Sequence, residues 1–211
     1  MATDKPSRGR PKDIHKQEEQ KQKLIDAARI LMREKSYRSV TIRDIGAAAG
    51  VNSAMVNYYF GGKETLFHAA IHDMTLTTFS QISDIINVEK PIRPFMEFIV
   101  KTMNEDKGLA KFIHDEILNE NYPFRDKFLA GFPSKVAELL PQLVERELAA
   151  HQISSSINVK YAAFNLMSMM IMPYLASPIR IGSWKIQDTE LCEEQWIEHL
   201  YQQFMHGILR D

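Results

Sequence analysis

The segment VTIRDIGAAAGVNSAMVNYYFGGKETLF, residues 40–67, constrains the fold more than any other part of this chain. Thr41 is a good helix N-cap, and Asp44 three residues later resembles the end of a capping box, with Asp in place of the usual Glu. Gly50 accepts the left-handed conformation that ends a helix, and Asn52 is a second N-cap. Two short helices around a glycine-containing turn are typical of a helix-turn-helix.

The second of these helices, which runs through Tyr59, has its apolar side chains on one face. We expect that face to be buried, with members Val51, Val56 and Phe60. We expect the other face to point outward, with members Ser53, Met55, Asn57, Tyr58 and Tyr59. Such side chains offer hydrogen-bonding groups for base edges and phosphates, and an apolar group for a thymine methyl. The alternative is that the tyrosines pack against the body and only their hydroxyl groups reach water.

Gly61 and Gly62 interrupt this helix, and Lys63 begins a longer one. A lysine in the first turn of a helix opposes the macrodipole, which makes it unfavourable there on structural grounds alone. The same helix end has free N–H groups that bind anions, and the glycines let a ligand approach the backbone. The sequence therefore predicts a DNA phosphate contact at Lys63.

The rest of the chain has helical spacing of its apolar residues and no sustained alternation of the kind found in strands. We expect an all-α fold with about nine helices. The further helical segments are Ile14–Lys35, Lys63–Ile86, Pro91–Asn104, Lys107–Glu120, Phe124–Ala149, Ser156–Leu175 and Thr189–Leu209.

Charge is divided unevenly along the chain. Residues 1–63 carry 13 Lys/Arg and 7 Asp/Glu, whereas residues 64–211 carry 13 and 20. A basic head on an acidic body indicates that the head binds a polyanion, unless the division is a chance fluctuation. Residues 1–13 are polar and are predicted to form a disordered basic arm. Within it, Arg8-Gly9-Arg10-Pro11 resembles an AT-hook core, which suits a narrow minor groove; the alternative is nonspecific charge attraction.

Composition also predicts the compartment. Cys192 is the single cysteine, so no intramolecular disulfide can form. The first 20 residues contain no apolar stretch of the kind found in secretion signals. The longest apolar run, Met167–Leu175, is shorter than the ~20 residues that span a bilayer. We expect a cytoplasmic protein with no membrane partner.

The segment that contains the helix-turn-helix resembles the signature of the TetR/AcrR family of bacterial transcriptional regulators, over roughly residues 17–74. The resemblance implies a DNA-binding head, residues 17–77, on a ligand-binding and dimerisation body, residues 78–211. It implies a homodimer formed through the last two helices. It assigns DNA contacts as follows: Thr41 and Arg43 at the start of the first short helix, Ser53, Ala54, Met55 and Tyr58 at base edges, and Asn57, Tyr59 and Lys63 at phosphates.

Two positions depart from the family pattern. Position 55 is often small or hydroxylated in the family and is Met here, and position 57 is commonly Tyr and is Asn here. Both positions belong to the predicted reading face, so no operator sequence can be carried over.

The body is rich in Met and aromatic residues, which suit a pocket for a small apolar or amphipathic effector. Candidate pocket walls are Phe79, Phe95, Phe98, Met103, Phe112, Phe128, Phe132, Leu166, Met167, Met170 and Tyr174, with His114, Glu116 and Asn119 as sources of polarity. Many of these residues must also be ordinary core.

The last helix has an apolar stripe of Leu191, Trp196, Leu200, Phe204 and Ile208, and the preceding one, Val159–Pro173, is apolar on more than one side. A helix that is apolar all round must be buried on all sides. A partner subunit would bury it; a monomer with a deep core is the alternative.

These observations favour a repressor that binds a palindromic operator as a homodimer and is released by a ligand. A transcriptional activator of the same family, and an architectural DNA-binding protein without an effector, are the alternatives. An enzyme is the alternative of another class, because His68 and His72 have the i, i+4 spacing of a metal pair. However, Ala69 stands where a zinc protease has Glu, and we find no phosphate loop, nucleophile elbow or Gly-x-Gly-x-x-Gly. We therefore expect no catalytic residue, no metal and no cofactor.

Overall fold

The computed structural model describes residues 14–82, 85–118, 123, 125–152 and 157–208, and these residues form helices and turns without a strand. The predicted all-α class is therefore confirmed. The arm that contains Arg8 and Arg10, and Asn119 in the body, lie outside the described residues.

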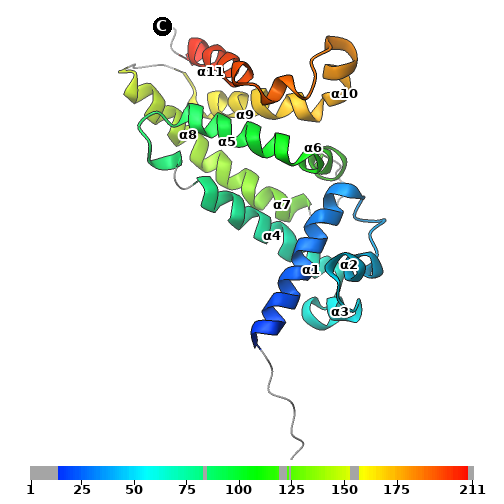
Figure 1. The fold of residues 1–211 in the computed structure, drawn as a ribbon. Helices are drawn as coiled ribbons and strands as arrows, with labels where there is room; N and C mark the ends of the chain where they lie inside the picture. The colour runs from blue at the N-terminus through cyan, green and yellow to red at the C-terminus, as the bar shows by residue number, and fades with distance from the viewer. Residues whose placement is uncertain (1–13, 83–84, 119–122, 124, 153–156, 209–211) are drawn as a thin grey trace, which may run out of the picture.

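The head is a three-helix unit at one end of an elongated molecule (Figure 1). It consists of α1 (Ile14–Glu34), α2 (Ile42–Ala49) and α3 (Ala54–Phe60). The long helix α4 (Lys63–Ile82) leaves the head and runs into the body. It continues without a break across residue 77, where the sequence predicted the boundary between head and body.

The body is a stack of longer helices above α4 (Figure 1). The α-helices are α5 (Ile92–Glu105), α6 (Lys107–Phe112), α7 (Arg125–Ala130), α8 (Phe132–Ala150), α9 (Val159–Leu175), α10 (Ser177–Ile179) and α11 (Glu194–Ile208). Short turns of 3-10 or π-helix lie between them: η1 (Ile85–Asn87), η2 (Ile113–Ile117), η3 (Arg180–Trp184) and η4 (Glu190–Cys192).

Four of the predicted helices end earlier or divide. The helix expected over 189–209 consists of the 3-10 turn η4 and α11, separated by Glu193 in an extended conformation. The helix expected from residue 63 to 86 ends at Ile82, and the one expected over 107–120 changes to a π-helical turn at Ile113. The helix expected over 124–149 divides at Gly131, whose amide bonds to the carbonyl of Phe128. A side chain at Gly131 would meet the Thr75 hydroxyl at 3.0 Å, so α4 approaches this break closely. The apolar pattern runs through both halves, which is why it predicted one helix.

Two apolar cores hold the molecule together. The body core is built mainly on α5, α8, α9 and α11. The head core is built on α1 to α4, but it also includes Phe112, Ile117 and Phe128 from the body elements α6, η2 and α7. The head therefore shares its core with the part of the body that lies against it.

Helix α1 also contacts the body directly. Arg33 at the end of α1 forms an ion pair with Asp106 at 2.5 Å. A Cβ atom added to Gly108 would lie 2.2 Å from the Cβ of Arg33, so α6 crosses α1 almost at backbone distance. Only glycine fits this crossing without a shift, because real Cβ atoms do not approach so closely.

Among the described residues, no single helix has the length and apolar composition needed to cross a membrane; α9 with α10–η3 passes that test only as a pair bent by 65°.

Candidate nucleic-acid interface and ligand cavities

The start of α2 is fixed by the capping box that the sequence predicts. The Thr41 hydroxyl accepts a hydrogen bond from the Asp44 amide at 3.1 Å, and the Asp44 carboxylate accepts one from the Thr41 amide at 2.9 Å. The second bond holds the pKa of Asp44 below its ordinary value, because it stabilises the charged form. Because the Thr41 side chain is engaged in this way, it positions α2 whether or not it also contacts DNA.

The turn between α2 and α3 also follows the sequence. Gly50 has φ 64°, the left-handed conformation expected of it, and its amide bonds to the carbonyls of Gly46 and Ala47. The Asn52 side chain accepts a hydrogen bond from the Ala54 amide at 2.9 Å and so supports the start of α3, although the residue directly before the helix is Ser53, whose side chain makes no capping bond. A Cβ at Gly46 would lie 2.8 Å from the Cα of Ser53, so the two helices cross closely.

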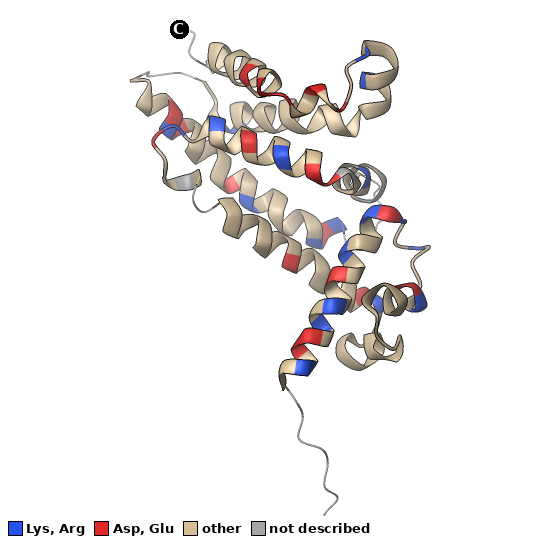
Figure 2. Cartoon of the chain, viewed as in Figure 1, with Lys and Arg blue, Asp and Glu red and all other residues tan. Residues whose placement is uncertain are grey.

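The outward face of α3 is polar but uncharged. Ala54, Asn57 and Tyr58 are exposed, and the Tyr58 side chain is 62 % exposed, a high value for a tyrosine. Arg43 on α2 is also exposed. Figure 2 shows the charged residues of the head on α1 and around α2, with none on α3. The face therefore offers hydrogen-bonding and stacking groups, and its neighbours supply the charge.

Met55 and Tyr59 do not point outward as the sequence suggested. Both are partly buried against the head core. The Tyr59 hydroxyl donates to the Gln20 side chain of α1 at 2.7 Å, and its ring lies edge-on to that of Tyr58 at 4.9 Å. The reason is that α3 has only seven residues and packs against both α2 and α4, while Tyr59 reaches α1 through Gln20, so the sides of α3 are covered as well as its inner face. Val56 is fully buried, as predicted, while Val51 and Phe60 are only partly buried.

Lys63 is partly buried, and its ammonium group points to the backbone of the head rather than away from it. Its ammonium group donates to the carbonyls of Tyr37 and Val40, each at 2.8 Å, and lies 4.0 Å from the centre of the Tyr37 ring. Burial lowers its pKa. The lysine thus ties the turn between α1 and α2 to the start of α4. This differs from the expected phosphate contact, because the nearest acceptors are backbone carbonyls of the preceding turn.

The body contains a small cavity of about 70 Å³ among α4 to α9. Its lining is almost entirely apolar and comprises Met74, Thr75, Thr78, Phe98, Ile99, Thr102, Met103, Leu109, Ile113, Phe128, Phe132, Met167 and Ile171. The three threonine hydroxyls donate to backbone carbonyls one turn earlier, which satisfies them without a ligand. Sequence reasoning missed these threonines, because nothing distinguishes them from surface threonines in a helical pattern.

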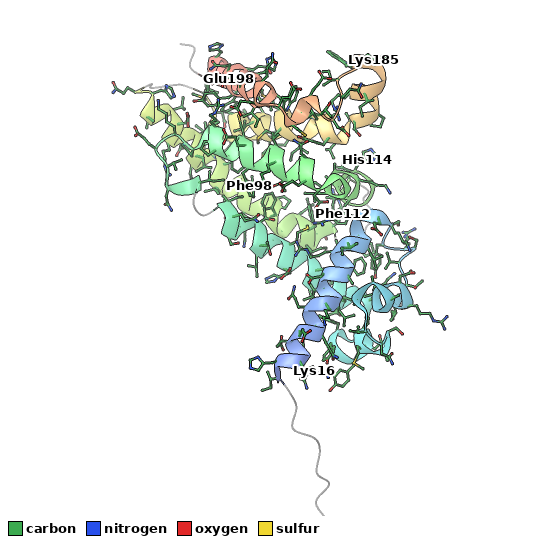
Figure 3. The ribbon with its side chains drawn as sticks, in the orientation of Figure 1. Lys16, Phe98, Phe112, His114, Lys185 and Glu198 are labelled. Carbon is green, nitrogen blue, oxygen red and sulfur yellow. The ribbon has the colours of Figure 1, made fainter. Side chains whose placement is uncertain are left out.

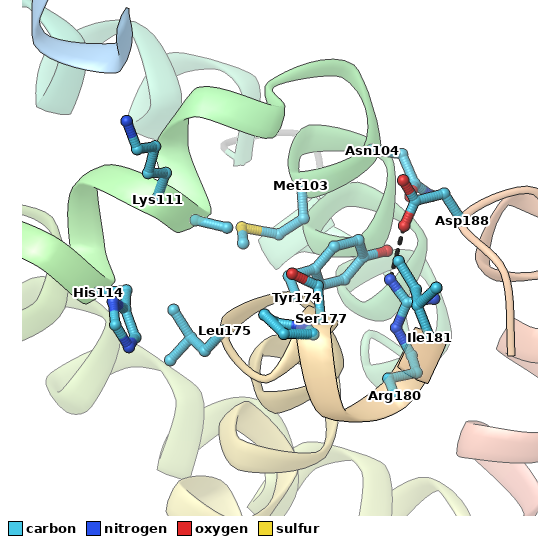
Figure 4. A pocket seen from close by; sticks show the side chains of 12 residues that line it. Met103, Asn104, Lys111, His114, Tyr174, Leu175, Ser177, Arg180, Ile181 and Asp188 are labelled. Carbon is cyan, nitrogen blue, oxygen red and sulfur yellow. Dashed lines mark hydrogen bonds and ion pairs between the residues drawn. The ribbon is translucent and has the colours of Figure 1, made fainter. Parts of the chain in front are cut away.

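A larger cavity of about 400 Å³ lies between α5, α6–η2 and the end of α9 (Figure 4). It is lined by Met103, Asn104, Ala110, Lys111, His114, Tyr174, Leu175, Ser177, Pro178, Arg180, Ile181 and Asp188. Met103 and Tyr174 lie in the middle of the view, with Lys111 and His114 on one side and Arg180 and Asp188 on the other. Burial raises the pKa of Tyr174, so its hydroxyl remains a proton donor.

The predicted pocket residues are thus divided. Phe98, Phe128, Phe132 and Met167 line the small cavity, His114 and Tyr174 line the large one, and Met103 lines both. The others line neither cavity, because they are needed to fill the cores: Phe95, Leu166 and Met170 are fully buried in the body core, Phe79 packs on Phe132, and Phe112 packs on Phe128 in the head core. The side chain of Glu116 is not among those described.

Two buried polar side chains organise the body, and the sequence did not single out either. Glu147 on α8 accepts hydrogen bonds from the Ile92 amide at 3.1 Å and from the Tyr201 hydroxyl at 3.0 Å. Arg180 donates to the carbonyls of Pro173 and Ile186 and pairs with Asp188 at 2.6 Å. These bonds join α5, α8 and α11 at one end of the body and close the loop after α9 at the other.

An apolar face runs along α9 and the segment that follows it. Phe164 is 72 % exposed and Trp184 is 74 % exposed, values that are high for such large apolar side chains; Tyr161, Met172 and Ile179 are exposed on the same segment. A shallow groove of about 340 Å³ lies between α9, α10–η3 and α11, and Trp196 lines it. Of the predicted apolar stripe on the last helix, Leu191, Leu200, Phe204 and Ile208 are buried within the chain itself.

The histidine pair has a different environment from a metal site. The Nδ1 atom of His68 lies 2.6 Å from the ammonium of Lys127, and burial is the main cause that lowers its pKa. His72 is exposed. The described residues contain no group of three His, Cys, Asp or Glu side chains that could hold a metal ion.

Comparison with known proteins gives matches to the head and to the whole fold. Residues 24–70 match the family described as bacterial regulatory proteins, tetR family. The probable HTH-type transcriptional regulator YttP of Bacillus subtilis is 22% identical over 161 residues, covering 74% of this chain and 77% of that protein. The HTH-type transcriptional repressor KstR2 of Rhodococcus jostii is 24% identical over 143 residues, covering 66% and 70%.

Solved structures share the fold over nearly the whole chain. The fatty acid degradation regulator FadR of Bacillus halodurans superposes with a TM-score of 0.72 at 18% identity, covering 91% of this chain and 97% of that one. FadR of Bacillus subtilis, solved with stearoyl-CoA, superposes with a TM-score of 0.70 at 16% identity, covering 89% and 98%. At such identities the likeness concerns the fold alone.

The matched segment, residues 24–70, includes the capped helix-turn-helix and most of the head core. The relatives that extend beyond it are transcriptional regulators and not enzymes. Residues 24–70 therefore form a DNA-binding head of the tetR family of bacterial regulatory proteins, and the chain is a transcriptional regulator.

Proposed function

We propose that the protein is a repressor that binds a palindromic operator as a homodimer and leaves it when a small molecule binds the body. The observation that carries the proposal is the exposed, uncharged face of α3, held on a rigid core by two capped helices. A face of this kind suits the major groove, where hydrogen bonds and stacking read base edges. KstR2 is named a transcriptional repressor, which supports repression rather than activation.

The exposed residues are the best candidates for direct contact. We assign base edges to Ala54 and Tyr58, with Ser53 at the start of the helix, and phosphates to Asn57 and Arg43. Met55, Tyr59 and Lys63 are partly buried, so we assign them to holding α3 in place; any DNA contact they make uses the small part of each side chain that reaches the surface. Thr41 has a capping role in addition to its predicted contact.

The apolar face of α9 supports the homodimer. Phe164 and Tyr161 stand out from the middle of α9 and are more than 70 % exposed in the single chain. Contiguous apolar surface of this kind marks an interaction site. A second copy that packs α9 and α11 against the same helices would cover it, and symmetric dimers use one patch in this way.

The sharing of elements between head and body supports release by a ligand. Helix α4 lines the small cavity and α6–η2 lines both cavities, and each of the two also contacts the head. A ligand that shifts either helix changes the spacing of the two heads, which must match half-sites about 34–36 Å apart or a compatible multiple. Ligand and operator then oppose each other by about 1–3 kcal/mol in each direction. The stearoyl-CoA bound to FadR of Bacillus subtilis, a ligand with a long alkyl chain, supports a body that accepts alkyl chains.

The test is selection of bound sequences from a random duplex library with the purified full chain, at two salt concentrations. We expect a palindromic sequence to be enriched at both concentrations. Weak binding without a common sequence, lost as salt rises, would show that the head only attracts polyanions, since nonspecific binding depends steeply on salt. That result would remove the proposal.

Single substitutions then test the assignment of residues. Tyr58→Ala should change which operators are preferred, because a base contact is worth about 1–3 kcal/mol for one base over another. Arg43→Gln should weaken all sequences alike and reduce the salt dependence. Tyr58→Ala acting equally on every sequence would exclude base reading by that residue. Glu97→Gln, an exposed change in the body, is the control.

The arm requires a separate experiment. Removal of residues 1–12 should lower affinity most for operators flanked by A·T pairs, if Arg8 and Arg10 enter the minor groove. A loss independent of the flanking sequence would indicate charge attraction alone.

A further inference from the structure

The two body cavities share a wall. Met103 lines both of them. Leu109 and Ile113 are four residues apart and therefore lie on one side of α6–η2, which faces the small cavity. Ala110, Lys111 and His114 lie on the side that faces the large cavity. The Met103 side chain and the segment α6–η2 lie between the two cavities.

The two spaces differ in chemistry. The small cavity has a lining of Met, Ile, Leu and Phe side chains, and its threonine hydroxyls are already satisfied. At about 70 Å³ it is below the ~300–1,000 Å³ of ligand pockets, whereas the large cavity, at about 400 Å³, lies within that range. The large cavity has a charged group, Lys111, which the small one lacks, while its Asn104 amide and Tyr174 hydroxyl donate to the carbonyls of Leu191 and Val100.

The lining of the large cavity carries one lysine, Lys111, and the ion pair of Arg180 with Asp188. Arg180 and Asp188 form an ion pair with each other and so cancel. Lys111 is exposed and makes no ion pair with the described side chains, and it stands on the opposite side of the cavity (Figure 4). An anionic or strongly polar group is therefore favoured beside Lys111.

We propose that the effector is an amphipathic organic anion whose charged end lies in the large cavity beside Lys111 and whose apolar chain passes Met103 into the small cavity. Methionine suits the position of the shared wall, because its unbranched side chain can change rotamer and let a chain pass. The ligand class follows from the two linings together: an apolar ligand leaves Lys111 without a partner, and a small polar anion leaves the small cavity without an occupant. The inference rests on the proposed function only in treating the body as the effector site.

The test is calorimetric titration of the full chain, without DNA, with decanoate, hexanoate and decan-1-ol. We expect decanoate to bind at least tenfold more tightly than hexanoate, because each added methylene that is buried strengthens binding. We expect decan-1-ol to bind about fivefold more weakly than decanoate, the size of one exposed ion pair. Equal affinities for all three would overturn the proposal without any variant being made.

Variants assign the two ends. Lys111→Gln should weaken decanoate about fivefold and leave decan-1-ol unchanged. Ile171→Trp, which fills the small cavity alone, should remove the advantage of decanoate over hexanoate. Lys101→Gln, an exposed change on α5 outside both cavities, is the matched control. If Ile171→Trp leaves the chain-length preference intact, the apolar chain lies elsewhere and the proposal is wrong.

Failure here and failure of the proposed function are distinguishable. A protein that selects an operator but binds no alkyl anion keeps the regulator proposal and overturns this inference. A protein that binds decanoate with dependence on Lys111 but selects no operator supports this inference and removes the regulator proposal.

Discussion

In the head, the groups that set the ends of the short helices are neighbours in the sequence: Thr41 bonds to Asp44 three residues away, and Asn52 bonds to Ala54 two residues away. In the body, Asp106 and Asn158 cap α6 and α9 locally in the same way, but the Ile92 amide at the start of α5 bonds to Glu147 across 55 residues. The comparison teaches that the two short helices of the head end where neighbouring residues dictate, whereas the shape of the ligand cavities exists only when the whole body is packed.

Glu147→Ala tests the long-range side of this comparison and should have the largest effect. The change removes a fully buried carboxylate, leaves a void and leaves the Ile92 amide and the Tyr201 hydroxyl without acceptors. Burial and the nearby carboxylate raise the pKa of Tyr201 to about 12, so this hydroxyl remains a donor that needs a partner. We expect a loss of about 3–5 kcal/mol in the free energy of unfolding, measured with urea. Glu145→Ala, exposed on the same helix, should change it by less than about 0.5 kcal/mol. A similar midpoint for both variants would contradict the role of Glu147.

Lys63→Met tests whether the head depends on one non-local contact. The carbonyls of Tyr37 and Val40 lose a charged donor, and we expect a cost of about 2–3 kcal/mol. Thermal unfolding without DNA provides the measurement. Lys16→Met, an exposed change on α1, is the comparison. If stability is unchanged and DNA binding is weaker, Lys63 makes the phosphate contact that the sequence predicts.

Gly108→Ala tests the joint between the two regions. The added methyl group meets Arg33, so α6 and α1 must separate, at a cost of about 1–3 kcal/mol. Gly207→Ala on α11 meets nothing within 4 Å and should be neutral or stabilising by up to about 1 kcal/mol. The same unfolding experiment compares the two. Equal effects of the two variants on the free energy of unfolding would mean that α6 moves without cost and that the close crossing does not limit the residue at position 108.

Thr41→Ala should have the smallest of the stability effects, about 1 kcal/mol, as is usual for an N-cap. The partner, Asp44, gives a pH test. Its pKa in the folded state is below the ordinary value of 3.8, so its contribution is present above that value and is lost as pH falls through the folded pKa. The difference in stability between the natural protein and Asp44→Asn should therefore shrink below about pH 4. A difference that persists at lower pH would show that the stabilisation by Asp44 does not depend on its charge.

The same division explains what the sequence could predict. Caps and turn glycines act over two or three residues, so the sequence alone predicts the roles of Thr41 and Gly50, and it predicts the Asn52 bond to the start of α3 to within one residue of the N-cap. The partial burial of Met55 and Tyr59 depends on α1 and α4, which a pattern within α3 cannot show. The division at Gly131 was missed because apolar spacing continues on both sides of it.

The candidate cavities were only partly predictable for a related reason. An aromatic residue in a helical stripe fills a core or lines a cavity according to what other helices leave open; Phe95 does the first and Phe98 the second, three residues apart on α5. Lys111 carried no signal at all, because its significance comes from the loop of Arg180 and Asp188 across the cavity.

The crossing of α6 and α1 has a mechanical consequence. Repulsion between atoms rises steeply as they approach, so a movement of α6 toward α1 at Gly108 displaces α1 by nearly the same distance. In the opposite direction, separation is resisted by the ion pair between Arg33 and Asp106 and by the packing of Phe112 in the head core. Repulsion at contact changes more steeply with distance than either of these attractions, so the joint is stiffer to compression than to separation. A ligand that expands the cavity toward α1 therefore moves the head more than one that draws α6 away.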